Sequence, residues 1–110
     1  MTVSAHNALA QLKISVSNLA LDAKDQLKIE QRVDITDELA LEYDNWYHAT
    51  IYRDDIGMTP ERRSTLDLLD KYLSSMKPEL FDEELLSSDL HWFEVRRIAR
   101  QSMAEWGWEH

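Results

Sequence analysis

Residues 59–78 have the sequence TPERRSTLDLLDKYLSSMKP, which contains the clearest helical pattern in this 110-residue chain. Thr59 can cap a helix, Pro60 suits the first helical position, and Glu61 suits the positive end of the helix dipole. Asp67 and Lys71 have the i, i+4 spacing of a stabilising ion pair. Apolar residues recur at helical spacing, at Leu66, Leu69, Leu73 and Met76. The pattern therefore predicts one amphipathic helix, which the Lys-Pro pair after Met76 ends.

A second helix is expected to precede this one, over residues 36–56. Thr36 or Asp34 can cap its first turn, where acidic residues follow and favour the helix dipole. The Ile56-Gly57 pair is a plausible end, because glycine readily adopts the left-handed conformation found after many helices. This segment contains all four of the tyrosine and tryptophan residues that precede Thr59.

The C-terminal third predicts a short acidic helical turn at 79–86 and then a last helix. Ser87 or Ser88 is expected to cap this helix, which continues to about Trp106. Its apolar positions share one helical face, and they are Trp92, Val95, Ile98, Ala99, Met103 and Trp106.

The first third of the chain fits two structures. One helical stripe joins Ala5, Leu9, Leu12, Val16, Leu19, Ala23 and Leu27. Short stretches also alternate like strands, which would allow a β-hairpin that turns at Asp22–Gln26. That turn lacks glycine and asparagine, so one or two helices are preferred. We therefore predict an all-α protein, a single-domain bundle of about four helices over residues 1–110, with an α+β fold carrying an N-terminal hairpin as the alternative.

Composition excludes several classes of protein. The chain has no cysteine, so disulfides and thiolate metal sites are ruled out. Its two glycines and two prolines are too few for the many turns of an all-β fold. No apolar run approaches the roughly 20 residues that span a bilayer, and the N-terminal residues lack the pattern of a signal peptide. A cytoplasmic protein that does not bind membranes is the expectation.

The net charge of −9 is concentrated in two acidic segments. Residues 34–58 hold seven acidic residues and one basic residue, and residues 78–90 hold five acidic residues and no basic one. A nucleic-acid-binding protein needs a basic surface, so this charge argues against that function. It allows attraction to a basic partner, although acidity also keeps small proteins soluble.

Residues 41–50, LEYDNWYHAT, combine three aromatic rings with a histidine, an aspartate and an asparagine. On a helix centred at Leu39, the rings of Tyr43, Trp46 and Tyr47 fall on one side together with Thr50, and this side is expected to face the core.

The opposite side of this helix carries a second stripe, at Leu41, Asn45, His48 and Tyr52. Five residues on or beside it form the predicted partner-binding surface: Asp44, Asn45, His48, Tyr52 and Asp55. Tyrosine beside asparagine, histidine and carboxylates is typical of protein recognition. The alternative is that this stripe packs against the N-terminal third of the chain.

A metal site is not expected. His6, His48 and His91 fall on three predicted helices and could meet, which loosely resembles the three-histidine site of DinB-like metal-binding bundles. The His-x-x-x-His pair of that family is missing, and so is the Glu-x-x-His motif of di-iron bundles. Asp44 and His48 alone would supply only two ligands. We predict no metal, no other cofactor and no catalytic residue.

The last helix has a second face with Phe93, Arg96, Arg97 and Arg100. The arginines are expected to pair with the neighbouring acidic segment at 79–89, and the alternative is a docking spot for a carboxylate or a second subunit. Trp108, after Gly107, is expected either to fold back onto the body or to anchor a partner.

These features favour binding over catalysis. The expected function is that of a small acidic module that docks on a basic protein and neutralises it. Bacterial immunity proteins, which block a toxin or nuclease, share this size and acidity. The alternatives are a self-associating subunit, such as a homodimer, and a metal-dependent helical-bundle enzyme.

Overall fold

The computed structural model describes residues 4–29, 34–53 and 55–108. Its helices are α1 (Ala5–Ala20), α2 (Ala23–Gln26), α3 (Ile35–Thr50), α4 (Pro60–Ser75) and α5 (Leu90–Trp106), with single 3-10 turns at Pro78–Leu80 and Glu83–Leu85. No strand occurs in these ranges, so the predicted all-α fold is confirmed and the N-terminal hairpin is wrong.

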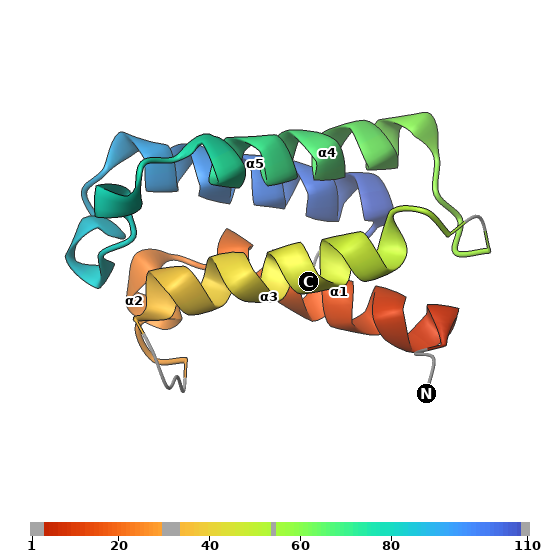
Figure 1. Ribbon diagram of the computed structural model, residues 1–110, viewed down its shortest axis with the longest axis horizontal. Helices are drawn as coiled ribbons and strands as arrows, with labels where there is room; N and C mark the ends of the chain where they lie inside the picture. Colours follow the sequence, from red (N-terminus) through yellow and green to blue (C-terminus); the bar gives the residue numbers. More distant parts are fainter. Residues whose placement is uncertain (1–3, 30–33, 54, 109–110) are drawn as a thin grey trace.

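The four long helices form a closed ring of neighbours. Helix α1 packs against α3 and α5, and α4 packs against α5 and α3. Successive long helices run in opposite directions, with α1 and α3 in one layer and α4 and α5 in the other (Figure 1). The result is an up-down-up-down bundle, a topology that needs only short connections. None of its helices is long and apolar enough to cross a membrane in the described part of the chain.

Short polar side chains cap the helices. Thr59 accepts a hydrogen bond from the Arg62 N–H at the start of α4, as predicted, and Asp34 accepts one from Thr36 at the start of α3. The prediction for α5 is wrong: Asp89 caps it instead of Ser87 or Ser88. The preceding turn continues through these serines, because the N–H of Asp89 still donates to the Leu85 carbonyl at 2.9 Å.

Helix α3 ends six residues earlier than the sequence predicts, at Thr50 instead of Ile56. Arg53 closes it by donating from Nε to the Ala49 carbonyl at 2.8 Å and from its backbone N–H to the Thr50 carbonyl at 3.0 Å. These bonds satisfy carbonyls that a longer helix would have satisfied internally. Gly57 adopts a positive φ of 77°, but in the loop that leads to α4.

The end of α1 is closed by side chains from distant parts of the chain. Gln26, in α2, donates to the carbonyls of Asn18 and Leu19 at 3.0 and 3.2 Å. From α5, Arg100 Nε donates to the Ala20 carbonyl at 2.8 Å. Arg96 Nε, also from α5, donates to the Leu21 carbonyl at 2.7 Å. Together these side chains bind four consecutive carbonyls, those of residues 18–21. Residues 22–26 therefore form a helical turn where the hairpin alternative placed a β-turn.

The expected pairing of the α5 arginines with residues 79–89 is wrong. Arg96 reaches that segment only through the Leu86 carbonyl, Arg97 pairs with Glu94 of its own helix, and Arg100 pairs with Asp22 at 2.8 Å. The carbonyls at the end of α1 attract Arg96 and Arg100, because the negative end of a helix favours cations.

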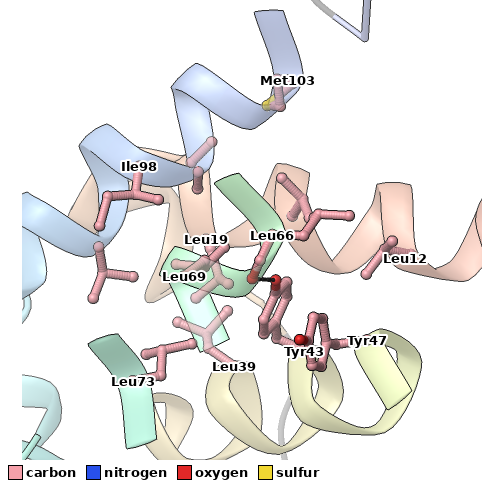
Figure 2. Close-up of a cluster of buried hydrophobic side chains, with 14 of the residues drawn as sticks. Leu12, Leu19, Leu39, Tyr43, Tyr47, Leu66, Leu69, Leu73, Ile98 and Met103 are labelled. Atoms are coloured by element: carbon pink, nitrogen blue, oxygen red, sulfur yellow. Dashed lines mark hydrogen bonds between the residues drawn. The ribbon is translucent and has the colours of Figure 1, made fainter. Parts of the chain in front are cut away.

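One hydrophobic core lies between the four long helices. Leu12 and Leu19 of α1, Leu39 and Tyr43 of α3, Leu66, Leu69 and Leu73 of α4, and Ile98 and Met103 of α5 all contribute to it (Figure 2). The predicted apolar face of α5 is buried throughout. At its end, Trp108 folds back and stacks on Trp106, with ring centroids 4.8 Å apart, because Gly107 adopts the left-handed conformation.

Candidate functional site

The predicted surface of α3 is exposed in its helical part. Asp44, Asn45 and His48 all face solvent, and Leu41 beside them is 63% exposed. We call Leu41, Asn45 and His48 the α3 ridge. The alternative, in which this stripe packs against the N-terminal third, is wrong, because α1 contacts the opposite side of α3, where Leu39 and Tyr43 are buried.

Tyr52 and Asp55 do not continue this stripe along the helix. Both are exposed, Tyr52 to 80%, but they lie beyond Thr50 in the turn and loop that lead to α4. The sequence prediction assigned them to α3 because it placed the end of the helix at Ile56. The early end of α3 turns Tyr52 toward the start of α4, where Arg63 Cζ lies 5.9 Å from its ring centroid.

A chain of contacts through α4 nevertheless connects Tyr52 with His48. Arg63 Nε lies 3.7 Å from one oxygen of Asp67, and the Tyr47 hydroxyl donates to the other at 2.6 Å. The Tyr47 ring then meets the His48 ring edge-on, with centroids 5.1 Å apart. The predicted Asp67–Lys71 pair is therefore replaced by contacts of Asp67 with Arg63 and Tyr47.

Two tyrosines of α3 stack side by side against α4 (Figure 2). The Tyr43 hydroxyl donates to the Leu66 carbonyl at 2.6 Å, and burial raises the pKa of Tyr43 well above its ordinary value. Burial and then the hydrogen bond to Asp67 raise the pKa of Tyr47. Both rings are core, as the sequence predicted, and both hydroxyls act as donors rather than as reactive groups. Trp46 is only partly buried, and its Nε1 donates to Glu42.

A groove of about 260 Å³ lies between α3 and α4, beside the α3 ridge. We call it the α3–α4 groove. Three carboxylates border it, those of Asp37, Asp44 and Asp70, and none of the described basic residues does. The remaining lining is mostly apolar, at Ala40, Leu41, Tyr43, Leu73, Ser74 and Phe81. A groove of this chemistry suits a lysine or arginine side chain, whose stem is apolar and whose head is cationic.

Asp70 is the residue of this groove that the sequence analysis missed. Burial raises its pKa, nearby Asp44 and Asp67 add to the effect, and His48 opposes it. A cation placed in the groove would relieve this mutual repulsion. Asp67 and Asp70 lie three residues apart beside the apolar face of α4. The sequence signal that could have identified this acidic edge is the Tyr47 hydroxyl, because a buried tyrosine needs a hydrogen-bond partner.

His48 is held by Asp44, one turn before it. Its Nδ1 lies 2.8 Å from the Asp44 carbonyl and 3.3 Å from Asp44 Oδ1. A carbonyl oxygen only accepts, so Nδ1 carries the proton and Nε2 is the titrating nitrogen. The bond to the carbonyl, followed by the negative charges of Asp44 and Asp70, raises the pKa of His48, while desolvation lowers it.

We expect NMR titration of the His48 ring to give a pKa above the ordinary value of about 6.5. The folded state then binds this proton more tightly than the unfolded state does, so the stabilisation is complete below the unfolded pKa and is lost as the pH rises through the folded pKa. Asp44→Asn should lower the pKa of His48 but not abolish the shift, because the backbone carbonyl remains. A titration at or below the ordinary value would contradict the geometry.

The three histidines on separate helices do not form a metal site. His6 lies on α1, whereas His48 and His91 each contact an aspartate close by in sequence. No group of three or more histidine, aspartate or glutamate side chains in the described ranges is arranged to hold a metal ion. The loose resemblance to DinB-like bundles therefore gains no support from the positions of these residues.

No protein-family model, curated protein or solved structure matches this chain. The geometry and charge of the site are therefore the basis for its function.

Proposed function

We propose that this chain is a small non-catalytic binding module that docks on a basic protein and neutralises it, as bacterial immunity proteins do with a toxin or nuclease. The observation that carries the proposal is the combination of the α3 ridge with the α3–α4 groove. An exposed ridge of leucine, asparagine and histidine lies directly beside an apolar groove bordered by three carboxylates. A cytoplasmic location, a bacterial source and the absence of cofactors remain predictions that accompany it.

The charges and the exposed side chains would act at different steps of binding. Asp37, Asp44 and Asp70 would attract a basic surface and speed the encounter, since clustered charges mainly raise the association rate. The ridge and Tyr52 would then hold the complex, since aromatic side chains in a contact surface often dominate its affinity. Added salt should therefore slow association, because surface charges are screened over about 10 Å at 0.1 M salt.

The test compares three baits in extracts of the native host. The first is the natural chain, the second carries Asp44→Asn with Asp70→Asn, and the third carries Glu79→Gln with Glu84→Gln, which removes the same charge away from the groove. We expect a basic protein to bind the first and third, and to associate about tenfold more slowly with the second. Equal association with the second and third baits would contradict the assigned site.

Self-association is the weaker candidate. A two-fold dimer through the α3 ridge would bring the acidic grooves of the two copies together, and like charges in close contact disfavour such a complex. Sedimentation of the purified chain distinguishes the two, since a stable dimer through this face would leave it unavailable to a basic partner. The metal-dependent enzyme is not proposed further, because no group of three or more potential ligands in the described ranges is arranged to hold a metal ion.

A further inference from the structure

A second cavity lies on the other side of α3, between α1 and α3. It has a volume of about 190 Å³ and is separate from the α3–α4 groove. We call it the α1–α3 cavity. Its apolar lining comes from Ile14, Ile29, Ile35 and Leu39, and its polar lining comes from Gln11, Ser15, Asn18, Glu38 and Glu42. The cavity takes no part in the proposed docking surface.

Ser15 marks this cavity as a place for a polar ligand. The residue is only 4% exposed, and its hydroxyl has no hydrogen-bond partner among the described residues. Most buried polar groups in proteins are hydrogen-bonded, so an unpartnered hydroxyl beside a cavity calls for an explanation. A ligand atom that donates or accepts at Ser15 supplies one.

The charge of the lining decides which kind of ligand fits. Glu38 and Glu42 lie one turn apart on α3 and therefore line the same side of the cavity. Among the residues that the structure describes, no basic side chain lines the cavity. Trp46 Nε1 donates to one oxygen of Glu42 at 3.2 Å, which orients that carboxylate. Two carboxylates and a hydroxyl beside Ile35 and Leu39 form a site with a strong preference for a cation that carries an apolar chain.

We propose that the α1–α3 cavity binds a primary alkylammonium group. An ammonium has three donors, enough for both carboxylates and the Ser15 hydroxyl. A four-carbon amine has five non-hydrogen atoms, which at about 30 Å³ each need about 150 Å³, within the volume of the cavity. The same group occurs in free amines and at the end of a lysine side chain. The site does not depend on the function proposed above, because a free amine needs no protein partner.

The experiment follows the methyl resonances of Ile35 and Leu39 by NMR during titration with n-butylammonium. We expect saturable shifts, and binding at least tenfold weaker for n-butanol, which has the same shape without the charge. Glu38→Gln combined with Glu42→Gln should weaken n-butylammonium binding at least tenfold, and Ser15→Ala several-fold. The matched control is Glu79→Gln with Glu84→Gln, which removes the same charge away from both the cavity and the α3–α4 groove and should change binding less than twofold.

Thermal unfolding of each variant shows whether the fold is retained. The proposal is wrong if shifts do not saturate at up to about 50 mM amine, a limit that still detects millimolar affinity. It is also wrong if n-butanol binds as tightly, or if the Glu79→Gln, Glu84→Gln control weakens binding as much as the cavity-side variant. Nα-acetyl-lysine N-methylamide separates the two sources: equal binding means that the cavity admits a lysine side chain of a protein, and binding of the free amine alone means a small-molecule site.

Discussion

Tyr43→Ala is expected to lower the free energy of unfolding by about 3 to 5 kcal/mol, the usual cost of truncating a buried aromatic ring. Tyr43 is 1% exposed, stacks on Tyr47 and donates its hydroxyl to the Leu66 carbonyl of α4. A loss of this size is a large part of the 5 to 15 kcal/mol that stabilises a typical domain. Chemical denaturation followed by circular dichroism measures it.

Tyr52→Ala is the matched control, because it removes the same side chain at a site that is 80% exposed. It should change the free energy of unfolding by no more than about 0.5 kcal/mol. In a binding assay with the isolated basic partner, Tyr52→Ala should weaken binding by about 2 kcal/mol if Tyr52 is a dominant contact. Tyr43→Phe, which keeps the ring and removes one hydrogen bond, should cost only about 1 kcal/mol of stability.

Unfolding of the Tyr52→Ala variant, with unchanged binding by its folded fraction, would contradict both assignments at once. It would mean that Tyr52 belongs to the packed body and that the recognition surface lies elsewhere. A Tyr43→Ala variant of near-natural stability would contradict the position of Tyr43 in the core.

The second large effect is expected at Arg96, which is 8% exposed. Its guanidinium donates to the Leu21 carbonyl at 2.7 Å, to Gln26 Oε1 at 3.0 Å and to the Leu86 carbonyl at 3.2 Å. Arg96→Met keeps an apolar stem and leaves these acceptors without their charged donor. Because unpaired buried polar groups are costly, we expect the free energy of unfolding to fall by about 3 kcal/mol.

Arg97→Met provides the control, one residue along the same helix. Arg97 pairs with Glu94 at the surface, and exposed pairs are worth about 0 to 1 kcal/mol. Arg96→Lys should recover little of the loss, since one ammonium cannot reproduce the fork of donors that contacts three separate acceptors. Equal stability of the Arg96→Met and Arg97→Met variants would show that the three hydrogen bonds contribute nothing net.

The sequence predicted the elements that depend on local patterns. Helix α4 was predictable from Thr59-Pro60 and its leucines, and the apolar face of α5 from its spacing, because capping and periodicity act over a few residues. The end of α3 was not, since it depends on how the side chain of Arg53 folds back onto the Ala49 carbonyl. The structure of the first third also depends on side chains that a local pattern does not include. Gln26, Arg96 and Arg100 bind the carbonyls at the end of α1, and all three lie outside that helix.

The candidate site was likewise predictable only in part. Asp44, Asn45 and His48 lie on the expected exposed side of α3, because helical spacing fixes which residues share a face. Asp70 and the α3–α4 groove could not be predicted, because they depend on which helix packs beside α3. The sequence pattern of a single segment does not reveal its neighbouring helix. Tyr52 and Asp55 are exposed as the prediction required, but they reach the surface from a loop.

The closure of α1 by α5 has a consequence for how the chain folds during its synthesis. The donors on Arg96 and Arg100 lie 75 and 80 residues beyond the carbonyls that they bind. While the ribosome is still adding the middle of the chain, the Ala20 and Leu21 carbonyls must therefore stay hydrated, although Gln26 can already bind the Asn18 and Leu19 carbonyls. Contacts between such distant residues close large loops, which slows folding. The bundle thus becomes complete only when the last helix has left the ribosome, so a nascent chain that stalls before Arg96 would present an incompletely closed α1 to chaperones and proteases.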